Sequence, residues 1–220
     1  MVATAPGSGL IVRMANNVAA IVRLMLVTDD RLVRGRDLVA LAQAAERGGA
    51  TCVQLRLKEA EPRLLTEAAR ALVRVLQVPV IVNDRPDIAV VSGAAGVHLG
   101  PGDLPPKLAR RVLGPGAIVG VSVGSEGEAL AGRDADYWGI GPWSATGTKS
   151  DAGAPLGAEG FRRLAAVAEG RPCIAIGGVT PGDVPAVLDA GGAGVAIVSG
   201  ILAAPDVTAA ARAYAVRLGA

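Results

Sequence analysis

Short apolar runs alternate with longer segments of helical periodicity from residue 24 to the end of the chain. The expected strands are Leu24–Thr28, Thr51–Arg56, Val80–Val82, Gly96–Leu99, Ile118–Ser122, Asp136–Ile140, Cys173–Ile176 and Gly194–Val198. The expected helices are Asp37–Arg47, Pro62–Leu76, Pro86–Val91, Pro105–Leu113, Ser125–Ala131, Ala158–Ala168, Pro181–Ala190 and Asp206–Leu218. Parallel strands need helical crossovers, and closing the sheet removes its edges. The pattern predicts an α/β fold, a single-domain (β/α)8 TIM barrel.

The length and composition agree with one barrel domain. A chain of 220 residues lies in the size range of a single α/β barrel. Aromatic residues make up only 2% of the chain, so Val, Ile, Leu and Ala must fill the core. We expect residues 1–22 to be a poorly determined leader, in which Met14 is a second candidate start, and residues 23–220 to form the catalytic barrel.

Charge and cysteine content restrict the partners and the compartment. The formal net charge is only +2 and the basic residues are scattered, which argues against nucleic-acid binding. No uncharged apolar segment reaches membrane-spanning length. Cys52 and Cys173 are too far apart for a zinc motif or a disulfide framework, so we expect reduced thiols in a cytoplasmic protein. A homo-oligomer is compatible with the sequence, because the outer helices of a barrel can form an interface without any motif.

The second expected strand ends in alternating polar and apolar residues. Gln54, Arg56 and Lys58 alternate with Leu55 and Leu57, so a continuing strand directs all three polar side chains to one face. At a barrel mouth, we expect these two cations to repel each other unless an anion lies between them, and a diphosphate would satisfy both. The alternative is an edge of solvated charge.

Two carboxylates follow the next two expected strands. Asn83-Asp84 ends the third strand, and Asp103 comes shortly after the fourth. Carboxylate oxygens near cations, without a His or Cys cluster, suit Mg²⁺. The alternative for each aspartate is to cap the helix that follows it.

His98 and Ser122 lie in neighbouring expected strands. We interpret His98, the only histidine, as a structural residue because it lies within an apolar strand. A nucleophilic Ser122 activated by His98 is a weaker alternative, because no oxyanion motif surrounds Ser122.

Two further regions have features of a phosphate site. The long interruption 141–157 carries Thr146, Thr148 and Lys149, which can donate to phosphate oxygens, although an ordinary surface loop is the alternative. Gly178 follows the seventh expected strand, and Val198, Ser199 and Gly200 end the eighth. The loops after these two strands are the usual phosphate site of such barrels.

Taken together, and in their order along the chain, these motifs resemble those of the thiamine-phosphate synthase family. The resemblance extends from about Leu24 to Leu218. That family joins 4-amino-2-methyl-5-pyrimidinylmethyl diphosphate to 4-methyl-5-(2-phosphooxyethyl)thiazole, and releases pyrophosphate by a dissociative, Mg²⁺-assisted substitution. The resemblance implies that Asp84 and Asp103 bind Mg²⁺. It implies diphosphate and pyrimidine contacts from Gln54, Arg56, Lys58, Asn83, Ser122 and Lys149, of which Arg56, Lys58, Ser122 and Lys149 act in catalysis. It implies thiazole phosphate contacts from Thr146, Thr148, Gly178, Val198 and Ser199.

The chain departs from the commoner family pattern at two positions. Pro101 stands where Gln is frequent, and Gly124 stands where His often follows the serine by two positions. A related barrel, the thiazole tautomerase, uses that histidine as a proton shuttle and tends to lack the Asn-Asp pair, so the sequence favours the synthase over the tautomerase. A third hypothesis is a non-catalytic barrel that binds a phosphate ligand, against which the two carboxylates argue.

Overall fold

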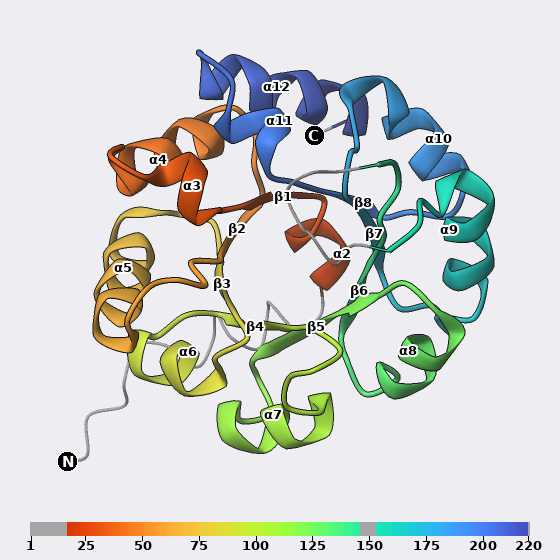
Figure 1. Cartoon of the computed structure of the whole chain (residues 1–220), viewed down its shortest axis with the longest axis horizontal. Helices are drawn as coiled ribbons and strands as arrows, with labels where there is room; N and C mark the ends of the chain where they lie inside the picture. The colour runs from red at the N-terminus through yellow and green to blue at the C-terminus, as the bar shows by residue number, and fades with distance from the viewer. Residues whose placement is uncertain (1–16, 146–152, 220) are drawn as a thin grey trace.

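The computed structural model describes residues 17–145 and 153–219, and these form a closed barrel of eight parallel strands (Figure 1). Each strand pairs with the next one along the chain, and β8 pairs with β1. The strands are β1 Leu24–Val27, β2 Cys52–Leu55, β3 Val80–Asn83, β4 Gly96–Leu99, β5 Ile118–Val123, β6 Tyr137–Ile140, β7 Cys173–Ile176 and β8 Gly194–Ile197. This is the (β/α)8 barrel expected from the alternation, with every strand predicted to within one residue at each end.

A ring of helices surrounds the barrel (Figure 1). The larger ones are α4 Leu38–Arg47, α5 Pro62–Val75, α6 Pro86–Ser92, α7 Pro106–Leu113, α8 Glu126–Ala131, α9 Gly157–Ala166, α10 Val184–Asp189 and α12 Val207–Leu218. None of the helices in the part of the chain that the structure describes is long and apolar enough to cross a membrane.

Four short elements were not predicted. They are α2 Val18–Ile21, α3 Asp30–Val33, α11 Ser199–Leu202 and the 3-10 turn η1 Pro181–Asp183. The helix expected at Pro181–Ala190 is therefore divided into η1 and α10. Helices of three or four residues are too short to show a helical period in the sequence.

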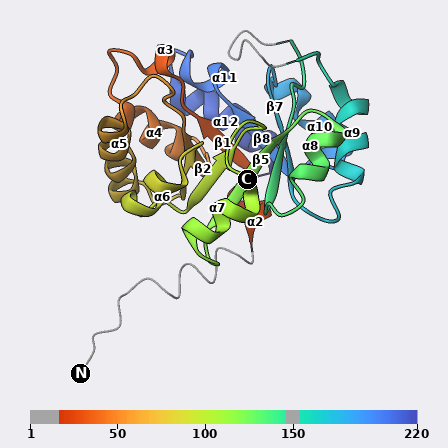
Figure 2. The same ribbon diagram turned by 60° about the horizontal axis from the view of Figure 1, so that its bottom comes forward.

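The core has two layers, because successive side chains of a strand point to opposite faces. Outward-facing residues such as Leu24 and Val53 pack beneath the helices. Inward-facing residues, among them Met25 and Ile81, form a separate cluster inside the barrel. α2 packs Val18 and Ile21 against this inner cluster, at the end opposite α3 and α11 (Figure 2). Residues 17–22 of the segment expected to be a leader thus belong to the packed barrel.

Tyr137 lies in the barrel interior beside Gly120, its register partner on the neighbouring strand β5. It is completely buried, and a Cβ added at Gly120 would lie 2.0 Å from its ring. Glycine at position 120 therefore makes room for the one large aromatic ring of the inner cluster.

We expect Gly120→Ala to reduce the free energy of unfolding by about 1–3 kcal/mol, because interiors tolerate inserted atoms poorly. Gly127→Ala is the matched control, since its Cβ would approach only the Ser125 hydroxyl, at 4.0 Å, and alanine favours the helix α8. Urea unfolding measures both variants. If Gly120→Ala were as stable as Gly127→Ala, the packing of Tyr137 described here would be wrong.

Candidate active site

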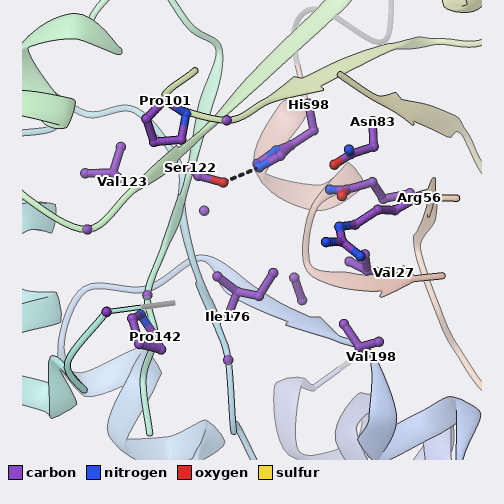
Figure 3. Close-up of a pocket in the computed structure, with 18 of the residues that line it drawn as sticks. Val27, Arg56, Asn83, His98, Pro101, Ser122, Val123, Pro142, Ile176 and Val198 are labelled. Atoms are coloured by element: carbon purple, nitrogen blue, oxygen red, sulfur yellow. Dashed lines mark hydrogen bonds between the residues drawn. The ribbon is translucent and has the colours of Figure 1, made fainter. Parts of the chain in front are cut away.

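A cavity of about 480 Å³ opens at the carboxyl ends of the strands. All eight strands contribute to its lining, through Val27, Gln54, Asn83, His98, Ser122, Gly139, Ile176 and Ala196. Figure 3 shows Arg56 and Asn83 on one side of this cavity and Pro142 on another. In TIM barrels this end of the strands carries the chemistry.

The three polar residues after the second apolar run all line the cavity. β2 ends at Leu55, so only Gln54 belongs to the strand, while Arg56 and Lys58 lie in the loop that follows. Gln54 is almost completely buried, and its amide donates to Met25 Sδ at 3.3 Å. The two-residue spacing correctly places the side chains on one side, although the strand does not continue through them.

Each of the two cations has its own carboxylate partner. Arg56 Nη1 lies 3.7 Å from Asp29 Oδ2, and Lys58 Nζ lies 3.4 Å from Asp84 Oδ2. The expectation that these cations repel each other unless an anion lies between them is therefore too simple. Protein carboxylates already offset much of their charge.

Asp84 has an unusual backbone conformation. Its φ is +63°, and the Arg85 amide donates to the Asn83 carbonyl at 2.8 Å, which closes a γ-turn around Asp84. A positive φ is rare outside glycine, although aspartate and asparagine tolerate it best. Its own amide donates to the His98 carbonyl at 2.8 Å, which holds the turn against β4. Such strained positions are often found at functional sites.

Asp84 and Asp103 interact directly. Burial raises the pKa of Asp84 most, and its contact with the Asp103 carboxyl raises the pKa further, against the lowering effect of Lys58. Asp103 Oδ2 also accepts the Gly100 amide at 2.6 Å. Neither aspartate caps a helix, because Arg85 and Pro105 occupy the N-cap positions of α6 and α7.

The paired carboxylates fit a magnesium ion. The Asp103 carboxyl raises the pKa of Asp84, and a cation bound between the two would stabilise the ionised form. Mg²⁺ binds one or two protein carboxylates together with phosphate and water. Among the described residues, no group of three or more His, Cys, Asp or Glu side chains could enclose a metal without further ligands. The pair thus suits a metal that shares its ligands with a bound phosphate.

His98 bridges Ser122 and Tyr137. Its Nε2 lies 3.1 Å from the Ser122 hydroxyl and its Nδ1 lies 2.9 Å from the Tyr137 hydroxyl (Figure 3 shows the first contact). Burial raises the pKa of Tyr137 well above its ordinary value, so the tyrosine stays protonated. The partner of Nδ1 is therefore a neutral phenol rather than the carboxylate of a Ser-His-Asp triad.

The loops after β7 and β8 also line the cavity. Gly178, Val198 and Ser199 all contribute, and Ser199 begins the short helix α11. Gly178 has a φ of +69°, and a Cβ there would lie 2.8 Å from the Ala145 carbonyl oxygen. Loops after β7 and β8 together with a short extra helix form the habitual phosphate site of TIM barrels.

Three expected site residues lie outside the described residues, namely Thr146, Thr148 and Lys149.

Sequence reasoning missed two acidic residues near the cavity. Asp29 pairs with Arg56, and Glu128 lines the cavity. Asp29 had a signal, because Thr28-Asp29 follows an apolar run in the same way as Asn83-Asp84. Glu128 had none, since it lies within a helix that reads as an ordinary surface element.

Comparisons with known proteins show which family the chain belongs to. The family model described as thiamine monophosphate synthase matches residues 24–201. The chain belongs to the thiamine monophosphate synthase family. It is 50% identical to the thiamine-phosphate synthase of Azorhizobium caulinodans over 194 residues, which cover 86% of this chain and 91% of that protein. It is also 50% identical to the thiamine-phosphate synthase of Xanthobacter autotrophicus, with 86% and 92% covered.

A solved structure has a similar fold. The thiamine phosphate pyrophosphorylase from Pyrococcus furiosus superposes with a TM-score of 0.81 at 34% identity, covering 92% of this chain and 98% of that one.

Both departures from the commoner pattern of the thiamine monophosphate synthase family line the cavity. Pro101 lies in the turn between β4 and α7, beside Gly100 and Gly102. The Gly124 amide donates to the Glu128 carboxylate at 2.5 Å. A Cβ at Gly124 would lie 3.1 Å from the Gly141 carbonyl oxygen, so a larger side chain here requires this loop to shift.

Proposed function

We propose that the chain forms thiamine phosphate by joining a pyrimidinylmethyl diphosphate to a thiazole monophosphate, with release of pyrophosphate. The thiamine-phosphate synthase function follows from family membership and from relatives at 50% identity. The metal, the order of bond breaking and the role of each residue are our proposal. The observation that supports them best is that the cations, the paired carboxylates and the glycine-rich loops after β7 and β8 meet at one cavity.

In this proposal, the diphosphate binds on the side of β2, β3 and β5. Arg56 and Lys58 donate to its oxygens, and Asn83 and Ser122 add neutral donors. Gln54, at the base of the cavity, orients the aminopyrimidine. Lys149, which lies outside the described residues, is the further cation that we assign to the diphosphate. Charge-assisted hydrogen bonds of this kind are stronger than neutral ones.

Asp84 and Asp103 would hold Mg²⁺ next to the diphosphate. When bound, the metal would neutralise charge on the diphosphate as pyrophosphate departs. With Asp84 committed to the metal, the Lys58 ammonium group, which otherwise lies 3.4 Å from Asp84 Oδ2, would be available to donate to a phosphate oxygen.

The bond between the methylene carbon and the diphosphate oxygen breaks before the bond from that carbon to the thiazole nitrogen forms. Its electron pair leaves with pyrophosphate, and the electron-rich aminopyrimidine stabilises the resulting cation. The thiazole nitrogen then donates its lone pair to that carbon. Such a step needs electrostatic stabilisation of a departing anion rather than a general base. This agrees with a cavity whose one histidine is hydrogen bonded to a serine and a phenol.

The thiazole phosphate binds at the opposite side, against the backbone of Gly178, Val198 and Ser199, with Thr146 and Thr148 as further donors. Glycine at position 178 lets the phosphate approach the backbone closely. The position of this phosphate directs the thiazole ring toward the methylene carbon.

Calorimetric titration with each ligand tests this division of the cavity. We expect the pyrimidine diphosphate to bind at least tenfold more tightly with Mg²⁺ present, and the thiazole phosphate to bind equally well with and without it. Diphosphate binding that ignores Mg²⁺ would contradict the metal assignment. Binding of the thiazole phosphate alone would favour a tautomerase or a non-catalytic binding barrel.

A further inference from the structure

Three consecutive residues after β1 hold the loop that carries Arg56 and Lys58. Thr28 Oγ1 accepts the Arg56 amide at 2.7 Å and donates to the Arg56 carbonyl at 3.1 Å. Asp30 accepts the amides of Lys58 and Glu59 at 2.8 and 3.2 Å. These contacts fix the backbone of the loop beyond the end of β2.

Asp29, between them, contacts the Arg56 side chain. The two side chains are 12% and 19% exposed, so water screens their charges only weakly. At 3.7 Å the contact is longer than a hydrogen bond. Within residues 17–145 and 153–219, the guanidinium group makes no hydrogen bond. Asp29 thus restricts the position of Arg56, while the N–H groups of the Arg56 guanidinium stay available for a ligand.

Asp29 also has a structural role. Its Oδ1 accepts the amides of Arg31 and Leu32 at 3.0 and 3.3 Å, which caps α3. The two functions use different oxygens, because Oδ2 is the atom that faces Arg56. The cap itself fixes the orientation of the carboxylate.

We propose that Asp29 is a positioning residue for the synthase reaction: it holds the Arg56 guanidinium in the orientation that receives the departing diphosphate. This rests on the proposed role of Arg56 in diphosphate binding. The Asp29 carboxylate already restricts the Arg56 side chain, so less conformational entropy is lost when the diphosphate binds. It also keeps the Arg56 cation paired while the cavity is empty.

A double-mutant cycle tests the proposal, with Asp29→Asn, Arg56→Gln and the combined variant. Asparagine caps helices as well as aspartate does, so Asp29→Asn removes the charge and keeps the cap. Asp37→Asn is the matched control, because Asp37 caps α4 through the Ala40 amide and does not line the cavity. The measurements are kcat and KM for the pyrimidine diphosphate, thermal stability, and calorimetric binding of inorganic pyrophosphate with Mg²⁺.

We expect Asp29→Asn to lower kcat/KM roughly tenfold, mainly through kcat, and Arg56→Gln to lower it about a hundredfold. The combined variant should be no worse than Arg56→Gln, because Asp29 acts through Arg56. Asp29→Asn should be less stable than Asp37→Asn, because it leaves the weakly exposed Arg56 cation unpaired, but both should stay folded in the assay and only the first should lose activity.

Independent effects that multiply in the combined variant would overturn the proposal and leave Asp29 as a helix cap. Normal turnover in Asp29→Asn would do the same. If Arg56→Gln itself kept normal turnover and pyrophosphate binding, the assignment of Arg56 to the diphosphate would fail, and the positioning role would fail with it.

Discussion

Replacing Asp84 by asparagine should lower kcat about a thousandfold without loss of stability. Asparagine tolerates the positive φ of residue 84, so the γ-turn is preserved while the charge is removed. A metal that offsets developing charge contributes several kcal/mol to the transition state, and about 4 kcal/mol corresponds to a thousandfold in rate. The measurement is steady-state thiamine phosphate formation over a range of Mg²⁺ concentrations.

The stability of this variant provides an independent check. The pKa of Asp84 is raised by burial and by Asp103, so its ionised form is less favourable in the folded chain than in the unfolded chain. A raised carboxylate pKa costs stability above that pKa, and the cost disappears as pH falls through it. At neutral pH, without metal, Asp84→Asn should therefore be at least as stable as the wild type.

Asp87→Asn is the control for Asp84→Asn. Asp87 lies three residues further on, pairs with Arg85 outside the cavity, and has a pKa lowered by that hydrogen bond. We expect normal activity in this variant. A normal rate in Asp84→Asn, or an equal loss in both variants, would remove Asp84 from the catalytic site.

Replacing Gly178 by alanine should raise KM for the thiazole phosphate about a hundredfold and leave KM for the diphosphate nearly unchanged. A side chain at a φ of +69° costs about 1–2 kcal/mol. The added Cβ would also lie 2.8 Å from the Ala145 carbonyl oxygen, which forces apart the loops after β6 and β7. Both effects act where we place the thiazole phosphate.

Gly35→Ala separates strain from the effect on the site. Gly35 has a φ of +71°, but no atom would lie within 4 Å of its Cβ, and it does not line the cavity. Gly35→Ala should lose a similar amount of stability through backbone strain and keep the wild-type KM for both substrates. If Gly178→Ala raised both KM values equally, the thiazole phosphate would not be bound where we propose.

The strands could be predicted because buried parallel strands appear as apolar runs bounded by turn residues. The short helices α2, α3 and α11 could not be predicted, because four residues are too few to show a helical period of apolar residues. α11 matters for function, since its first residue, Ser199, lines the cavity. Here the sequence predicted the residue but not the helix that presents it.

Much of the candidate site could be predicted for a similar reason. Polar residues directly after apolar runs, such as Asn83-Asp84, must meet at one end of a parallel barrel. The ion pairs could not be predicted from the sequence. The contact between Asp29 and Arg56, for example, depends on the register of β1 against β2, in which Val27 pairs with Gln54. The expected repulsion between Arg56 and Lys58 ignored those carboxylates for the same reason.

The most direct test of the central claim is to mix the purified chain with the pyrimidine methyl diphosphate and the thiazole phosphate, with and without Mg²⁺. We expect thiamine phosphate and pyrophosphate to form in equal amounts, and only with Mg²⁺. Folded protein that binds both ligands with Mg²⁺ but forms no thiamine phosphate would contradict the synthase function.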